Sequence, residues 1–229
     1  MSNKKKISVI GLGSMGYGIA QSLVRSGYIV YGQDINPLQQ KKLIEEGGAK
    51  ENISFDLLDA VFIVVLNDKQ TRDILFGEDG IAKKLRKGTL IIVCTTVSPD
   101  FAKEMAMNCK SYGLLYLDAP ISGGSLKSSQ GKLSYMISGS NEAYNLAKPI
   151  LEATSETIFE FGETPGAGSA MKAVNQMLAG VHIAAMAEAL TFGITQGIEP
   201  KRFLEVISKC AGSSWMLENR APHIIDNDY

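Results

Sequence analysis

The chain has 229 residues, which is long enough for one domain of ordinary size and part of a second. Its 23 Lys and Arg residues nearly balance its 24 Asp and Glu residues. No strong overall field therefore attracts nucleic acid or an anionic membrane, and a small neutral or anionic ligand is the better expectation.

The three cysteines, Cys94, Cys109 and Cys210, lie far apart and form no C-x-x-C pair. This spacing argues against a disulfide framework and against a zinc site, and it favours a reducing, cytoplasmic location. Lysines 4–6 followed by apolar residues resemble the start of a signal peptide, but glycines interrupt the apolar run and no cleavage pattern follows. We also expect no stretch that is long and apolar enough to span a bilayer.

Short apolar runs alternate with helix-length segments from the N-terminus to about residue 162. This alternation is typical of an α/β domain with a parallel sheet and helices on both faces. The continuous apolar character of runs such as 60–66 suits strands that are buried on both faces. The expected strands are 7–10, 29–31, 60–66, 90–94, 114–117, 134–138 and 158–160.

The pattern changes after Gly162, because residues 169–196 contain no proline and are rich in Ala, Met, Leu and Ile. They predict a single helix of about 28 residues, roughly 40 Å long, which is too long to pack on one small domain. We therefore expect one α/β domain at 1–165, and at 166–229 a long interdomain helix that begins a second, helical domain. That helical part is expected to be incomplete, or completed by a partner chain.

A glycine-rich motif follows the first expected strand, and a helical pattern opens inside it. A second strand ends at Asp34, 18 residues beyond the motif, as in a dinucleotide-binding βαβ unit. The glycines permit a tight turn, close approach of a pyrophosphate and close helix packing, while the helix N-terminus offers free N–H groups. The alternative is that the glycines only serve turns. The motif residues are Gly11, Leu12, Gly13, Ser14, Met15 and Gly16.

Asp34 is placed to accept hydrogen bonds from the adenosine ribose, and its charge would repel a 2′-phosphate, so NAD is favoured over NADP. The alternative is an ordinary turn residue. Residues that follow later strands are further cofactor candidates, namely Leu66, Thr95 and Thr96. The two threonines could contact the nicotinamide side, or a hydroxyl could instead cap the helix that starts near Ser98.

The segment after the strand at 114–117 contains Ser122, Gly123 and Gly124. Adjacent glycines permit a concave backbone whose N–H groups converge on an anion, and the serine hydroxyl adds a donor. A substrate carboxylate would fit there, although the segment can also be a simple loop.

Lys172 lies near the start of the long helix, and Asn175 and Gln176 follow at i+3 and i+4 on the same face. The helix macrodipole disfavours a lysine in the first turns, so a functional reason is worth considering beside the alternative of a surface lysine. A buried lysine at a positive helix end has a lowered pKa, which suits a general base.

Four features together resemble the β-hydroxyacid dehydrogenase family: the motif at 11–16, DAPISGG at 118–124, GAGSAMK at 166–172, and Asn175. The resemblance implies a Rossmann-type doubly wound sheet, a long interdomain helix and an all-helical domain through which subunits pair as a homodimer or homotetramer. It implies Lys172 as the catalytic group, Ser122, Gly123 and Gly124 as substrate anchors, and Asn175 as a polar helper. Gln176 departs from the asparagine that is frequent in the family, and the family's later helices and a further lysine are missing.

Within the family, segments 176–185 and 213–220 are most similar to members that act on a four-carbon sugar acid. His182 is expected to be structural. The expected reaction moves a hydride from the hydroxyl-bearing carbon of a small hydroxy acid to NAD, with no metal. Two alternative functions remain. A non-catalytic NAD sensor would not need Lys172. A 6-phosphogluconate-type enzyme would need a cluster of basic residues for the substrate phosphate, and neither motif has one nearby.

Overall fold

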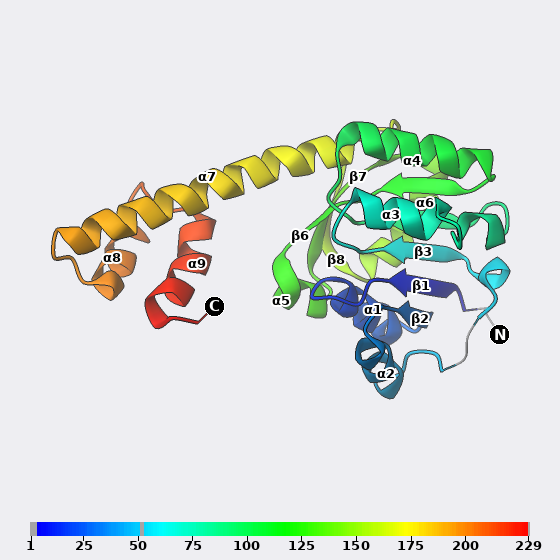
Figure 1. Cartoon of the computed structure of the whole chain (residues 1–229), viewed down its shortest axis with the longest axis horizontal. Coiled ribbons are helices and arrows are strands. Elements are labelled where there is room, and N and C mark those ends of the chain that lie inside the picture. The colour runs from blue at the N-terminus through cyan, green and yellow to red at the C-terminus, as the bar shows by residue number, and fades with distance from the viewer. Residues whose placement is uncertain (1–3, 51–52, 229) are drawn as a thin grey trace. The chain divides into compact units, whose positions relative to one another are not determined.

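The computed structural model describes residues 4–50 and 53–228. The chain divides into two compact units, the first ending at Lys172 and the second beginning at Ala173 (Figure 1). Each unit is described by itself below.

The first unit is built on one sheet with helices on both sides. Its strands are β1 (Lys6–Ile10), β2 (Ile29–Gln33), β3 (Ala60–Ile63), β4 (Leu90–Val93), β5 (Leu115–Asp118), β6 (Ile121–Ser122), β7 (Leu133–Gly139) and β8 (Ser155–Glu160). Its helices are α1 (Gly16–Arg25), α2 (Pro37–Glu45), α3 (Asp68–Phe76), α4 (Pro99–Ser111), α5 (Gly124–Ser129) and α6 (Asn141–Glu152), with 3₁₀ turns at Phe55–Leu57 and Ala82–Lys84.

The strand order is β2-β1-β3-β4-β5-β7-β6, with β8 paired to β7. The first five strands of this order run parallel, which confirms the Rossmann-type arrangement. The expectation of a purely parallel sheet is wrong at β7, which is antiparallel to β5. A parallel connection needs a crossover, and the chain between β5 and β7 is used instead by the short strand β6 and the six-residue helix α5.

Alternate strand residues enter two apolar layers, which explains the continuous apolar runs. Ile7, Val9 and Phe62 pack in a layer with residues of α1 and α6, whereas Val61 and Ile63 pack with residues of α3 and α4 on the other face. Figure 1 shows α1 and α2 on one side of the sheet and α3 and α4 on the other. Burial on both faces is therefore confirmed.

The long helix is α7 (Ala167–Thr195), which has 29 residues and begins two residues earlier than expected. By length and composition alone, α7 could cross a membrane, because it contains an 18-residue window with a mean hydropathy of 1.6. Of that window, 17% is buried. The expectation that no stretch reaches this length and apolarity is therefore wrong. The sequence expectation failed because numerous alanines make the segment apolar without a run of large aliphatic residues.

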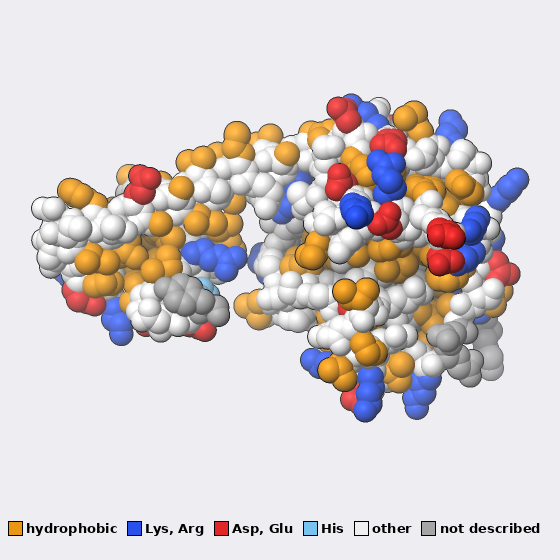
Figure 2. All heavy atoms as spheres, in the orientation of Figure 1, with side chains coloured by type: hydrophobic (Ala, Val, Ile, Leu, Met, Phe, Trp, Pro, Cys, Tyr) orange, Lys and Arg blue, Asp and Glu red, His pale blue; other side chains and the backbone are white. Residues whose placement is uncertain are grey.

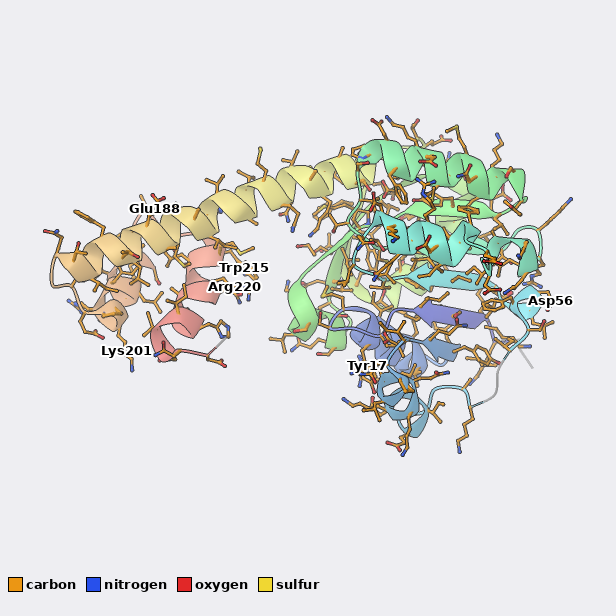
Figure 3. The ribbon with its side chains drawn as sticks, in the orientation of Figure 1. Tyr17, Asp56, Glu188, Lys201, Trp215 and Arg220 are labelled. Carbon is orange, nitrogen blue, oxygen red and sulfur yellow. The ribbon has the colours of Figure 1, made fainter. Side chains whose placement is uncertain are left out.

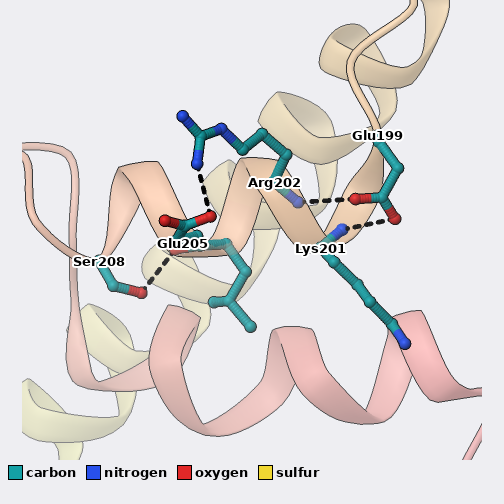
Figure 4. A network of polar contacts seen from close by, with 6 residues as sticks. Glu199, Lys201, Arg202, Glu205 and Ser208 are labelled. Atoms are coloured by element: carbon teal, nitrogen blue, oxygen red, sulfur yellow. Dashed lines mark hydrogen bonds and ion pairs between the residues drawn. The ribbon is translucent and has the colours of Figure 1, made fainter.

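In the second unit, the last turns of α7 join α8 (Pro200–Ile207) and α9 (Trp215–Asp226). Five buried residues form its core, namely Met186, Leu190, Phe203, Leu217 and Ala221. The Glu199 carboxylate caps α8 by accepting from the backbone N–H groups of Lys201 (3.1 Å) and Arg202 (2.9 Å), as Figure 4 shows.

Large apolar side chains remain exposed on this second unit, and Figure 2 shows many of them on the visible face. They include Met177, Val181 and Phe192 of α7, with exposed fractions of 65%, 59% and 67%, and Trp215 of α9, which Figure 3 labels. A core of five residues is small for an independent domain, so this unit has more apolar surface than it can bury alone.

Candidate functional site

The glycine-rich motif forms the turn between β1 and α1, as expected. Gly11 has a φ of +94°, and a Cβ there would collide with the carbonyl oxygen of Val64. A Cβ at Gly16 would collide with the carbonyl oxygen of Gly11, so both positions require close backbone approach. At Gly13 nothing lies within 4 Å of the Cβ position, which leaves open space against the backbone.

The amides at the start of α1 have no side-chain cap. Four other helices of the same unit do have one, supplied by Asn36, Asn67, Ser98 and Ser140. Uncapped N–H groups at a helix start, beside the open space at Gly13, suit the negative charge of a pyrophosphate. These residues therefore fit a bound dinucleotide.

Asp34 follows β2 directly and reaches back to the glycine-rich motif. Its Oδ2 accepts from the backbone N–H of Leu12 at 2.6 Å, and its Oδ1 accepts from that of Asn36 at 2.8 Å. The carboxylate therefore ties the end of β2 to the motif, a contact that the sequence does not predict. A carboxylate oxygen can accept more than one hydrogen bond, so capacity remains for ribose hydroxyls.

The three strand-end candidates have different surroundings. Leu66 follows β3 and is 85% exposed. Thr95 is buried, its hydroxyl oxygen accepting from the backbone N–H of Val65 at 3.3 Å, whereas Thr96 is exposed. The cap of α4 is Ser98, which accepts from the N–H of Phe101 at 3.2 Å, so neither threonine caps that helix. The alternative reading of the threonines as helix caps is therefore wrong.

The predicted anion loop lies between β6 and α5. Ser122 ends β6, where it pairs with Ser134 of β7. Gly123 and Gly124 both have positive φ values, +136° and +72°, which only glycine adopts at low cost. The backbone therefore bends at two successive residues, as the anion-binding interpretation requires.

Lys172 lies in the second turn of α7 and is 7% exposed. Burial lowers the pKa of its ammonium group below the ordinary lysine value, because a desolvated charge is unfavourable. Across residues 4–50 and 53–228, no carboxylate lies within ion-pair distance of its Nζ to oppose that shift. The side chain can therefore exchange a proton nearer to neutral pH than an exposed lysine can.

Asn175 and Gln176 follow one turn later on the same helix, as expected. The Asn175 side-chain amide donates to Oε1 of Gln176 at 3.3 Å. Asn175 is half-buried and Gln176 is exposed. The two amides form a polar pair on a mostly apolar helix, which suits hydroxyl recognition.

Asp118, the last residue of β5, is a functional candidate that the sequence interpretation missed. It is fully buried, and Ser138, Gly166 and Ser169 donate hydrogen bonds to it. The signals in the sequence are a charged residue at the end of the apolar run 114–117 and its place as the first residue of the motif at 118–124. His182, expected to be structural, lines an apolar pocket of about 360 Å³ within the second unit.

Comparisons with known proteins agree with this geometry. Residues 6–162 match a family model described as the NAD-binding domain of 6-phosphogluconate dehydrogenase. Residues 166–229 match one described as the NAD-binding domain of NADP-dependent 3-hydroxyisobutyrate dehydrogenase. Together the two models extend over nearly the whole chain.

Individual relatives are similar over almost all of the chain. An L-threonate dehydrogenase from Cupriavidus necator is 43% identical, over 98% of this chain and 77% of that protein. An L-threonate dehydrogenase from Escherichia coli K12 is 40% identical, over 97% and 75%. The crystal structure of a 3-hydroxyisobutyrate dehydrogenase from Salmonella typhimurium has a TM-score of 0.93 and 40% identity, over 99% and 80%.

The strand order, the glycine-rich turn, the buried lysine and these matches all agree. The chain belongs to the β-hydroxyacid dehydrogenase family of NAD-dependent oxidoreductases that act on CH–OH groups.

Proposed function

We propose that this dehydrogenase oxidises L-threonate at the hydroxyl next to the carboxylate, with Lys172 as the general acid–base group. The substrate assignment is supported by relatives named L-threonate dehydrogenase, at 43% and 40% identity over nearly the whole chain. The assignment of Lys172 rests on its burial and its lowered pKa. 3-Hydroxyisobutyrate and tartronate semialdehyde remain the alternative substrates.

Oxidation removes a hydride and a hydroxyl proton from the same C–OH group. Bound NAD supplies the hydride acceptor. Neutral Lys172 takes the hydroxyl proton, and in the reverse direction its ammonium returns it. Because burial favours the neutral amine, the lysine can act as a base at a pH where an exposed lysine would be protonated.

The substrate carboxylate is proposed to bind Ser122, Gly123 and Gly124, where two successive positive φ values bend the backbone as an anion-binding concavity requires. The remaining hydroxyls of a sugar acid need partners, because a buried unpaired hydroxyl costs on the order of 1–3 kcal/mol. Asn175 and Gln176 are the candidates we favour. Ser214 is not among them, because its hydroxyl oxygen already accepts from the N–H of Leu217 at 3.1 Å as the cap of α9.

The motif residues Gly11, Leu12, Gly13, Ser14, Met15 and Gly16 are proposed to bind the pyrophosphate, and Asp34 the ribose. Leu66, Thr95 and Thr96 are proposed to complete the cofactor site from the ends of β3 and β4. We further propose that the chain pairs as a homodimer or homotetramer through the exposed apolar surface of the helical unit. A cytoplasmic location is supported by its three free cysteines.

Replacing Lys172 by alanine should lower kcat by about 10²–10⁴-fold, the usual contribution of a positioned acid–base group. NAD affinity, measured by fluorescence titration, should stay within a few-fold. Lys201→Ala, which removes an exposed lysine of α8, is the matched control and should keep full activity. A Lys172→Ala enzyme with more than about a tenth of the wild-type rate would remove Lys172 from the base role.

NAD should be preferred over NADP, and Ile35→Arg should raise kcat/KM for NADP relative to NAD. Ile35 is fully exposed, so the arginine can reach a 2′-phosphate without disturbing the fold. Adding Asp34→Asn should reverse or erase the preference, although it also disturbs the bonds to Leu12 and Asn36. Leu38→Arg, an exposed site on α2, controls for added charge. Equal use of both cofactors by the wild type would contradict the ribose role of Asp34.

The substrate is tested by comparing kcat/KM for L-threonate, D-glycerate and 3-hydroxyisobutyrate. L-threonate should give the highest value, because its hydroxyls can hydrogen-bond to the polar pair at Asn175 and Gln176. The methyl group of 3-hydroxyisobutyrate would leave those two amides without partners. If either of the other two acids is preferred, the sugar-acid assignment fails and the family assignment stands.

Light scattering coupled to size exclusion should give a multiple of the 24.7 kDa chain mass. Val181→Asp should weaken association, since it places a charge on the exposed apolar face of α7. Glu188→Gln, on the same helix and labelled in Figure 3, should not. A wild-type mass of one chain would contradict the pairing proposal.

A further inference from the structure

Asp118 has an unusually complete set of donors for a buried carboxylate. Its Oδ2 accepts from the Ser138 hydroxyl (2.9 Å) and from the backbone N–H groups of Gly166 (3.0 Å) and Ser169 (2.9 Å). Its Oδ1 accepts from the Ser169 hydroxyl at 2.6 Å. Within the described residues, no lysine or arginine forms an ion pair with it. The start of α7 therefore supplies most of the stabilisation of this carboxylate.

Ser138 extends the same contact. It lies opposite Asp118 in the antiparallel pairing of β5 and β7, and while it donates to Asp118, its oxygen accepts from the backbone N–H of Gly168 at 3.0 Å. Three backbone N–H groups at the start of α7, those of Gly166, Gly168 and Ser169, thus donate to two side chains of the sheet, Asp118 and Ser138. Helices α4 and α6 are capped instead by the serine that precedes them, so α7 differs in being capped from distant strands.

The backbone at the start of α7 is also packed too closely to move independently of the sheet. A Cβ at Gly168 would collide with the carbonyl oxygen of Met136 on β7. A Cβ at Gly166 would lie 2.6 Å from the carbonyl oxygen of Pro99, where α4 begins. The first turn of α7 is therefore packed against β7 and α4, and three hydrogen bonds to Asp118, from Gly166 and Ser169, fix its orientation.

We propose that Asp118 is a positioning residue that fixes Lys172 through the first turn of α7. Lys172 follows Ser169 by three residues, less than one helical turn, so a shift of that turn moves the lysine directly. On the other side, Asp118 is four residues before Ser122, the first of the proposed substrate anchors. The carboxylate that holds the start of α7 therefore stands on the segment that leads into the proposed anion loop. The inference rests on the role of Lys172 given above.

The test compares a serine at the start of α7 with a serine at the start of α6, a helix that carries none of the proposed catalytic residues. Ser169→Ala removes one bond to Asp118, whereas Ser140→Ala removes the cap of α6, which accepts from the N–H of Ala143 at 3.2 Å. Both should lower the thermal midpoint. Only Ser169→Ala should lower kcat, by on the order of 10–100-fold, because a displacement of Lys172 by about 1 Å lowers the reaction rate by roughly that factor. NAD affinity should stay within a few-fold in both.

The pH profile gives a readout that a purely structural cap would not move. The base must be neutral, so kcat/KM falls as the pH drops through the pKa of Lys172. Burial lowers that pKa, and a loosened first turn exposes the lysine and raises it again. The acid limb of Ser169→Ala should therefore shift to higher pH, and that of Ser140→Ala should not. Asp118→Asn, which places an amide before four donors, should show the same two changes more strongly. If it fails to fold, Ser138→Ala replaces it.

Equal behaviour of Ser169→Ala and Ser140→Ala, with full kcat and an unshifted acid limb, would overturn the positioning role while Lys172→Ala still abolishes turnover. An active Lys172→Ala enzyme would overturn the base role as well, and with it this inference. The two failures are therefore distinguished by Lys172→Ala alone.

Discussion

A buried carboxylate that lacks a cationic partner is stable only where enough donors surround it, and this requirement connects the parts of the first unit. The donors to Asp118 come from β7 and from the start of α7. The antiparallel pairing of β5 and β7 places Ser138 directly opposite, and Gly166 and Gly168 let the helix approach closely enough to donate. The irregular half of the sheet is thus the half that anchors the long helix.

A second carboxylate performs a related task on the cofactor side. Asp34 accepts from the backbone N–H of Leu12 and so holds the glycine-rich turn against the end of β2. Asp34 directly follows β2 and Asp118 ends β5, so both lie at the ends of parallel strands, and both bind backbone amides. A turn whose conformation is already fixed loses little conformational entropy when a ligand binds. This preorganisation favours both affinity and catalysis.

The sequence predicts the regular features well because they depend on local pattern: the strands β1 to β5, the glycine-rich turn and α7 all follow from apolar period and glycine position. It does not predict the direction of β7, the strand β6 or the role of Asp118. The bonds of Asp118 join residues 20 to 51 positions apart, and nothing in the neighbouring sequence encodes such a contact. The hydrogen bond from the N–H of Val65 to the Thr95 hydroxyl likewise joins residues 30 positions apart and could not be predicted.

The close approach at Gly166 and Gly168 limits how such an enzyme can change over evolutionary time. Under the proposed substrate role of Asn175 and Gln176, a lineage that acquires a new substrate can vary these two side chains, which are half-buried and exposed. A methyl group at Gly168 would push the helix off the carbonyl of Met136, and every residue carried by its first turn would move together. Divergence of specificity is thus permitted at one part of the helix and prevented at another, only two turns away.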